Sequence, residues 1–314
     1  MTEKVYFNHD GGVDDLISLF LLLQMEDVEL VGVGAVDADS YVGPAAEASR
    51  KIIDRFGHAQ KLAVAISDSR AVHSFPKEWR LAAYSENALP ILNEAGTIMT
   101  PISPEPAHLD LLHKLQQTTT PPLSLVFTGP LTDLARALQI DPTIEKKIKR
   151  LVWMGGTFLE RGNVAEPDSD GTQEWNAFWD PAAVKTVFDT QIPLELVSLE
   201  STNNVPLTQE IRQHWAAQRR FTGLDFIGNS YALVPELRLF ETNSTYYLWD
   251  VLTTCYFFAA DIVKTKEITC AVNTSSPSDG RTYLDPNGRP AKLIYDVSHE
   301  KFFALIDRLA RKVD

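Results

Sequence analysis

Short apolar runs alternate with segments of helical period along most of this chain. The runs expected to form strands are Val5–Phe7, Glu29–Val36, Leu62–Ile66, Leu123–Thr128, Leu151–Met154 and Ile192–Leu199. The segments expected to form helices are Asp14–Met25, Ala45–Phe56, His108–Gln117, Leu131–Ile140 and Pro181–Phe188. Strands that alternate with helices indicate βαβ units and a largely parallel sheet.

Beyond residue 200 we expect the chain to be mostly helical, ending with a helix over His299–Lys312. There is no internal repeat, low-complexity tract or clear linker. We therefore predict one domain over residues 1–314, an α/β fold with an open, mostly parallel (mixed) twisted sheet flanked by helices. Two less regular stretches, Ser67–Leu89 and Gly223–Thr245, lead to or carry aromatic residues and are candidate mobile lids.

Composition describes an ordinary globular chain and excludes several kinds of partner. A formal net charge of -13 argues against nucleic acid and anionic membranes as partners. The longest apolar span, Leu16–Leu23, falls far short of the ~20 residues that a membrane helix needs. Cys255 and Cys270 form no paired metal motif and are expected to be buried, inert thiols. With no basic segment before the first strand, we expect a cytoplasmic protein.

The densest group of acidic residues lies between the first strand and the first helix. Asp10, Asp14 and Asp15 share a glycine turn there, at the edge where open α/β sheets bind ligands. Three like charges repel one another unless a cation joins them or some remain protonated. Helix capping explains one carboxylate but not three, so the turn favours a hard divalent metal ion. The alternative is an aspartyl-nucleophile phosphatase loop, but Asn8 stands at the nucleophile's position and cannot form an acyl phosphate.

Further candidate groups follow the later strands. Asp39 ends an Asp-Ala-Asp loop after the second strand, and the backbone carbonyl of Thr128 is a suitable Ca²⁺ ligand at the end of another. A polar loop after Leu151–Met154 carries the polyol-binding candidates Asn163, Glu174 and Asn176. Trp249 and Asp250 precede an apolar helix. Each group alone also fits a solvated loop end, a turn or a helix cap.

In their order along the chain these motifs resemble those of the nucleoside hydrolases, in particular the purine-specific branch that prefers inosine, adenosine and guanosine. The family's D-x-D-x-x-x-D-D motif matches residues 8–15, and its M-G-G, R-G-N and E-x-N motifs match residues 154–156, 161–163 and 174–176. An Asp before a buried helix matches Asp250. The resemblance extends from residue 4 to about residue 260 and implies a Rossmann-like nucleoside hydrolase fold.

The resemblance implies a Ca²⁺ site beside a ribose site. The implied Ca²⁺ ligands are Asp10, Asp15, the backbone carbonyl of Thr128, and Asp250. The implied ribose contacts are Asp14, Asn163, Glu174, Asn176 and Asp250. Asp10 is then placed to take a proton from the metal-bound water that attacks the N-glycosidic bond.

Two tryptophans point to the purine-specific branch. Trp249 stands where many relatives have a His that serves as acid to the leaving base, and Trp79 lies in an F-P-K-E-W-R stretch found in that branch. The branch also has an acidic residue near the base, matched by Asp39. These matches imply a purine stacked between Trp79 and Trp249, which favours a cationic base. Its protonation would come from solvent or through Asp39, because His9 points to the opposite face of its strand.

The chain departs from the family pattern at two positions. Asn8 replaces the first Asp of the motif, and Gly12 stands where the branch often has Asn or another residue. Two alternatives stay open: a broad or pyrimidine-preferring hydrolase, and a Ca²⁺-dependent nucleoside-binding protein without turnover. The resemblance further implies a role in purine salvage and a homodimer or homotetramer.

Overall fold

The computed structural model describes residues 2–58, 61–118, 122–234 and 246–313. In these ranges nine strands form one sheet in the order β3-β2-β1-β4-β5-β6-β9-β7-β8. The strands are β1 (Glu3–His9), β2 (Val28–Ala35), β3 (Val64–Ile66), β4 (Leu123–Phe127), β5 (Ile148–Met154), β6 (Leu194–Val197), β7 (Val263–Val272), β8 (Thr282–Leu284) and β9 (Arg289–Val297). Strands from β3 to β9 pair in parallel, whereas β7 is antiparallel to β9 and β8. The predicted mixed sheet is confirmed.

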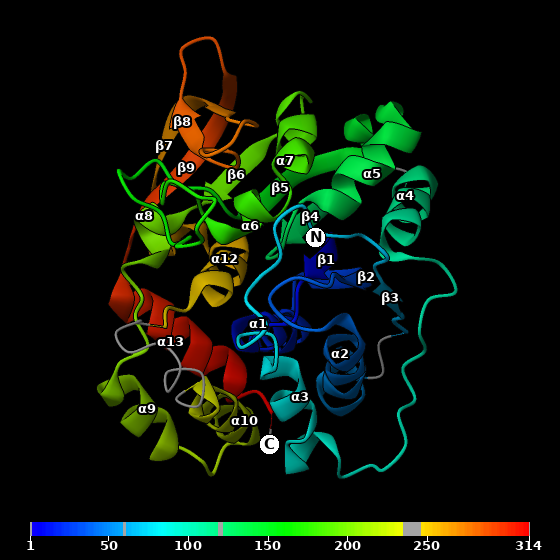
Figure 1. Cartoon of the computed structure of the whole chain (residues 1–314). Helices are drawn as coiled ribbons and strands as arrows, with labels where there is room; N and C mark the ends of the chain where they lie inside the picture. The colour runs from blue at the N-terminus through cyan, green and yellow to red at the C-terminus, as the bar shows by residue number, and fades with distance from the viewer. Residues whose placement is uncertain (1, 59–60, 119–121, 235–245, 314) are drawn as a thin grey trace.

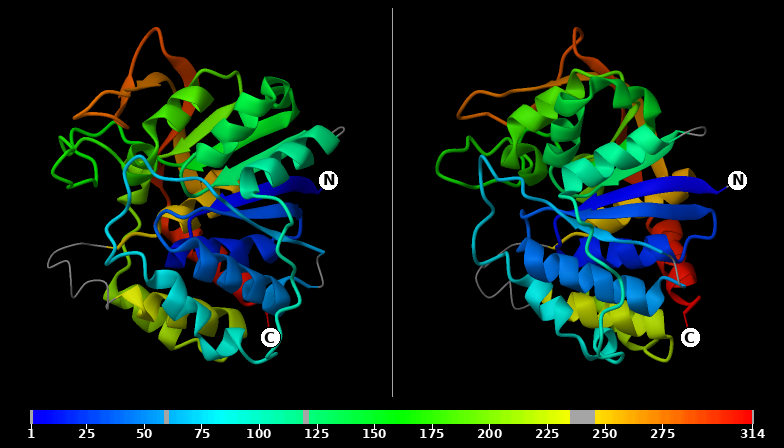
Figure 2. Two further views of the ribbon diagram at one scale, coloured as in Figure 1. Left: turned by 45° about the vertical axis from the view of Figure 1, so that its right-hand side comes forward. Right: turned by 90° about the vertical axis from the view of Figure 1, so that its right-hand side faces the viewer.

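Helices cover both faces of this sheet (Figure 1). They are α1 (Val13–Leu23), α2 (Val42–Phe56), α3 (Ala82–Asn87), α4 (Ala107–Gln117), α5 (Thr132–Ile140), α6 (Trp175–Trp179), α7 (Pro181–Phe188), α8 (Leu199–Thr202), α9 (Gln209–Ala216), α10 (Thr222–Ala232), α12 (Trp249–Phe258) and α13 (His299–Ala310). Figure 2 shows α4 and α5 above the strands and α1 and α2 below them. The chain therefore has a three-layer, single-domain α/β fold.

The two largest hydrophobic cores follow from the alternation of side chains along the central strands. Val5 and Phe7 of β1 join the core that contains α1, α2 and α12. Tyr6, between them, joins the core of α4, α5 and α7 on the other face. Successive side chains of a strand point to opposite faces, so a strand covered on both sides tends to carry a continuous apolar run, as Val5–Phe7 does in β1.

The prediction of a mostly helical last third missed β7, β8 and β9. In β7 the residues from Lys264 to Glu267 are exposed, and only Cys270 and Val272 are buried. A strand that faces water along most of its length has no continuous apolar run, which is the pattern that marks the inner strands. The predicted last helix is confirmed, because α13 begins at His299.

Strand order locates the site. Successive strands run outward from β1 through β2 to β3 on one side, and from β4 through β5 to β6 on the other. Open α/β sheets bind ligands at such a switch point, beyond the carboxyl ends of the strands. Within the described ranges, no helix has both the length and the apolar character needed to cross a membrane.

Candidate active site

A pocket of about 250 Å³ opens beyond the carboxyl ends of β1, β4 and β5. It is lined by Asp10, Asp14, Asp39, Trp79, Thr128, Asn163, Glu174, Asn176, Trp249 and Asp250. These are all but one of the site residues predicted from the sequence. The exception is Asp15, which is fully buried and accepts hydrogen bonds from the Thr128 hydroxyl (2.5 Å) and the Gly12 N–H (2.8 Å). The fold therefore gathers side chains from distant parts of the chain around one pocket.

One end of the pocket is strongly acidic. Asp10, Asp14, Asp15 and Asp250 are each at most 6% exposed. Burial, and then the charge of Asp15, raises the pKa of Asp10 well above its usual range. The pKa of Asp250 is likewise raised well above its usual range, first by burial and then by Asp14. No Lys or Arg is among the described residues that line the pocket, so the negative charge there is not balanced by the lining side chains.

Asp14 is held at both carboxylate oxygens by one segment of the chain. The Tyr246 hydroxyl donates to Oδ1 at 2.7 Å, and the Asp250 N–H donates to Oδ2 at 3.2 Å. Burial and the charge of Asp15 raise the pKa of Asp14 to about 7, although both hydrogen bonds favour the ionised form. Sequence reasoning gave Tyr246 no role. Its position just before Trp249 was the available signal.

The donor atoms at the acidic end suit a hard cation. Carboxylates of Asp10, Asp15 and Asp250 and the carbonyl of Thr128 are the oxygen ligands that Ca²⁺ prefers. In the described residues, however, no group of three or more His, Cys, Asp or Glu side chains is arranged to hold a metal ion. The Thr128 carbonyl instead accepts a hydrogen bond from Asn176 Nδ2 at 2.9 Å. The chemistry and the unbalanced charge fit a cation, whereas the side chains do not form a finished coordination shell.

The loop after β5 supplies polar groups to the middle of the pocket. Glu174 caps α6: Oε1 accepts from the Asn176 N–H (2.8 Å), and Oε2 accepts from the N–H groups of Gly156 (2.8 Å) and Ala177 (3.2 Å). Burial raises the pKa of Glu174 to about 7, and these three N–H groups offset part of the effect. Asn163 Oδ1 accepts from the Trp175 N–H at 3.1 Å. Asn176 Oδ1 is buried without a hydrogen-bond partner among the described residues, as expected of a ligand contact.

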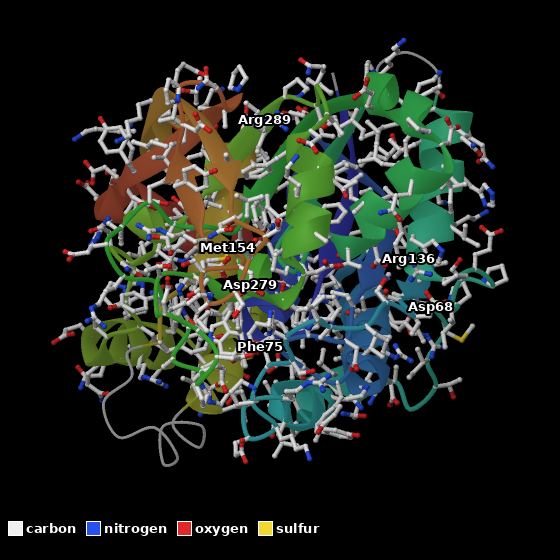
Figure 3. The ribbon with its side chains drawn as sticks, turned by 45° about the horizontal axis from the view of Figure 1, so that its top comes forward. Asp68, Phe75, Arg136, Met154, Asp279 and Arg289 are labelled. Carbon is white, nitrogen blue, oxygen red and sulfur yellow. The ribbon has the colours of Figure 1, made fainter. Side chains whose placement is uncertain are left out.

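The other end of the pocket is aromatic. Trp79 packs edge-on against Trp175, with centroids 5.5 Å apart, and Trp175 stacks on Phe75 at 4.6 Å. Trp249 packs edge-on against Tyr246 at 4.8 Å. Figure 3 labels Phe75 and Met154, two lining residues from the loop after β3 and from β5. Sequence reasoning assigned no site role to Trp175, Phe75, Met154 or Tyr247, which all line the pocket.

Asp39 approaches the acidic end closely because residue 12 is glycine. Its N–H donates to Asp10 Oδ2 at 3.1 Å. A Cβ atom on Gly12 would lie 2.4 Å from Asp39 Oδ2, so any other side chain there would displace this carboxylate. Burial, and then the charges of Asp15 and Asp14, raise the pKa of Asp39 well above its usual range, while Arg80 lowers it. The departure at Gly12 therefore has a steric consequence at Asp39.

The two residues before Asp10 face away from the pocket. His9 is fully buried, stacks on Phe7, and has Nε2 3.0 Å from Ser49 Oγ. The expected opposite orientation of His9 is confirmed. Asn8 Nδ2 donates to Asp133 Oδ2 at 3.2 Å, so the residue at the first motif position lies behind the site. Of the two predicted lids, Ser67–Leu89 contains α3, whereas residues 235–245 of Gly223–Thr245 lie outside the described residues.

Comparison with known proteins identifies the family to which this geometry corresponds. The model of the inosine-uridine preferring nucleoside hydrolase family matches residues 5–304. A crystal structure of the inosine-uridine preferring nucleoside hydrolase from Bacillus anthracis is 55% identical, covers 99% of this chain and 100% of that chain, and has a TM-score of 0.94. A purine-preferring ribonucleoside hydrolase from Gardnerella vaginalis is 22% identical, covers 99% and 100% of the two chains, and shares the fold with a TM-score of 0.79.

More distant relatives carry both uridine and pyrimidine specificities in their names. Probable uridine nucleosidase 1 from Oryza sativa subsp. japonica is 25% identical over 66% of this chain and 62% of that protein. The pyrimidine-specific ribonucleoside hydrolase RihB of Escherichia coli O1:K1 / APEC is 23% identical over 98% of this chain and 97% of its own length. The preference for one class of base is therefore not fixed by overall similarity.

Proposed function

The chain belongs to the inosine-uridine preferring nucleoside hydrolase family, whose members hydrolyse the N-glycosidic bonds of nucleosides, and from this premise we propose that it cleaves purine ribonucleosides to ribose and free base with Ca²⁺ as its metal ion. One observation carries the proposal: all but one of the acidic, polar and aromatic residues predicted from the sequence line a single pocket. Its acidic end suits the sugar and a cation. Its aromatic end suits a planar base.

The roles of the polar residues follow from their chemistry. Asp10, Asp15, Asp250 and the Thr128 carbonyl would hold Ca²⁺, which when bound orients water and makes it easier to deprotonate. Asp10 is the base that takes the proton of the attacking water, a contribution typically worth ~10²–10⁴ in rate. The ribose hydroxyls are held by Asp14, Asn163, Glu174, Asn176 and Asp250. Dense negative charge beside the sugar favours a transition state that resembles a ribosyl cation.

The leaving base is served by aromatic and acidic groups. Trp79 and Trp249 contact different aromatic partners at the pocket wall, which supports a base held between them. Stacking on electron-rich rings favours a positively charged purine and so assists its protonation. That proton comes from solvent or through Asp39, which lines the same pocket. The unpartnered Nε1 atom of Trp249, within the described residues, is a further donor available to a ligand.

Substrate preference is tested by comparing nucleosides on one enzyme preparation. Inosine, adenosine, guanosine, uridine and cytidine are incubated separately, and the free base is quantified by chromatography. We expect kcat/KM to be larger for the purine nucleosides by at least about tenfold, and Trp249→Ala to lose most of this advantage because stacking is worth ~1–3 kcal/mol per base. Uridine turned over as fast as guanosine would contradict purine preference and favour the broad or pyrimidine-preferring alternative.

The proposed homodimer or homotetramer rests on the family resemblance. Light scattering of the purified chain at micromolar concentration measures it directly. A mass equal to the 35.1 kDa of one chain would contradict the proposal.

A further inference from the structure

We propose that Arg80 is a positioning residue that holds the turn carrying Trp79 against the loop carrying Asp39. The two groups proposed to serve the leaving base would then move as one unit. This inference rests on the proposed function, because it concerns the two groups of the same pocket that are proposed to serve the leaving base. It assigns a role to a residue that does not line the pocket itself.

The Arg80 side chain binds the loop after β2 on either side of Asp39. Its Nε donates to the Ala38 carbonyl at 3.0 Å, and its Nη2 contacts the carbonyl (3.2 Å) and Oδ1 (2.7 Å) of Asp37. The guanidinium carbon also lies 4.3 Å from the centre of the Tyr41 ring. Only 12% of the side chain is exposed. Partly buried and multiply bonded, it is held in one orientation.

The Arg80 backbone completes the connection. Its carbonyl accepts hydrogen bonds from Ser40 Oγ (3.2 Å) and from the Tyr41 N–H (3.3 Å). Ser40 Oγ also accepts from the Ala83 N–H at 3.0 Å, which ties the start of α3 to the same point. Asp39, between the bonded residues, donates its N–H to Asp10. Arg80 thus joins the Asp39 loop through both its side chain and its main chain.

Trp79 is the neighbour that this connection places. Its N–H donates to the Pro76 carbonyl at 3.1 Å and the Arg80 N–H to the Lys77 carbonyl at 3.3 Å, so the two residues share one turn. The indole reaches the pocket and packs against Trp175. A rigid fork of donors such as guanidinium suits this task, whereas a Lys ammonium cannot reach the same acceptors in one geometry. The orientation of Trp79 relative to Asp39 therefore depends on Arg80.

The test is a double-mutant cycle on the nucleoside that the unmodified enzyme cleaves fastest. Arg80→Met should lower kcat/KM by ~10–100-fold, the loss expected when reacting groups are misplaced by about 1 Å. The kcat/KM of Arg80→Lys should lie between those of the unmodified enzyme and Arg80→Met, because Lys keeps the charge but makes fewer of the hydrogen bonds. In a Trp79→Ala, Asp39→Asn background the same Arg80→Met change should cost less than about threefold. If Arg80→Met does not fold, the cycle is run with Arg80→Lys.

Arg289, labelled in Figure 3, gives a matched control. It also donates to backbone carbonyls, those of Val187, Ile192 and Pro290, and its guanidinium carbon lies 5.9 Å from the centre of the Phe188 ring. Arg289→Met should lower Tm without a comparable loss of kcat/KM. The inference would be overturned if Arg80→Met lowered kcat/KM by the same factor in both backgrounds. It would also be overturned if Arg289→Met lowered kcat/KM as much as Arg80→Met does. A preference for uridine would instead overturn the proposed purine substrate and leave the cycle valid.

Discussion

The hydroxyl of Tyr246 donates to Asp14 Oδ1 at 2.7 Å and so joins the start of α1 to the segment before α12. Hydrogen bonds to charged groups contribute ~1.5–3 kcal/mol. We therefore expect Tyr246→Phe to lower kcat/KM by about 10–100-fold, measured by release of free base. Tyr231→Phe is the control, because the buried Tyr231 hydroxyl has no hydrogen-bond partner among the described residues. Equal activities for the two variants would show that the Asp14 contact is dispensable.

The buried carboxylates predict opposite effects of one substitution with and without metal. In metal-free protein, Asp250→Asn removes a carboxyl group whose ionisation is opposed by burial and by Asp14, and should raise Tm at neutral pH. In the unmodified protein, Ca²⁺ at 100 times its Kd should add ~2.7 kcal/mol of stability, and the variant should lose most of this gain. Thermal melting with a chelator and with added Ca²⁺ measures both effects. A variant that melts lower than the unmodified protein in chelator would refute the repulsion argument.

Gly12→Ala should perturb the site mainly through Asp39, because a Cβ atom there would come closer to Asp39 Oδ2 than to Asp15 Oδ2 (3.2 Å) or Asp14 Oδ1 (3.3 Å). Gly12 has φ -60°, which any residue adopts, so the cost comes from the Cβ atom 2.4 Å from Asp39 Oδ2. Overpacking of this kind costs about 1–3 kcal/mol. We expect Gly12→Ala to lower stability in urea unfolding, and most of the loss to disappear when Asp39 is also changed to Ala. A cost that persists in the double variant would place the clash elsewhere.

Glu86 predicts a pH dependence of stability outside the pocket. It is fully buried on α3, and Oε1 accepts from Ser230 Oγ at 2.6 Å. Burial raises its pKa from 4.5 to about 8, so between these values the folded protein binds more protons than the unfolded chain. Its contribution to stability is therefore present at low pH and is lost as pH rises toward 8.

Glu86→Gln removes this dependence while keeping an oxygen for Ser230. A tenfold change in proton affinity is worth ~1.4 kcal/mol, so between pH 5 and 8 the unmodified protein should lose a few kcal/mol relative to the variant. Urea unfolding at several pH values gives the difference directly. Parallel stability curves for the two proteins would contradict a raised pKa at Glu86.

The sequence predicts the inner sheet well because burial on both faces leaves a local pattern. β1 and β4 each contain a continuous apolar run, Val5–Phe7 and Leu125–Phe127, so each can be predicted without knowledge of its neighbours. β7 has no such apolar run over most of its length, because its exposed face carries Lys264 and Lys266. Its pairing with β9 cannot be read from the sequence of β7 alone. Strands at the side of a sheet are thus harder to predict than strands at its centre.

The site residues differ in the same way, because some are marked by a local sequence pattern and others are not. Asp10, Asp14 and Asp15 are close in sequence, and three carboxylates on one glycine turn after a strand form a local pattern that indicates a ligand site. The partner of Tyr246, by contrast, lies near the other end of the chain, and no local pattern connects them. The burial of Asp15 behind the pocket and the contact between Gly12 and Asp39 depend on packing in three dimensions. Such relations exist only in the folded molecule.

The position of β1 between β2 and β4 has a consequence for motion. A nucleoside in the pocket would bridge loops from both halves of the sheet, with Asp39 on one side and Thr128 on the other. A bound nucleoside would then connect the two halves of the sheet. Amide hydrogens in β2 and in β4 should therefore both exchange with solvent deuterium more slowly when the pocket is occupied.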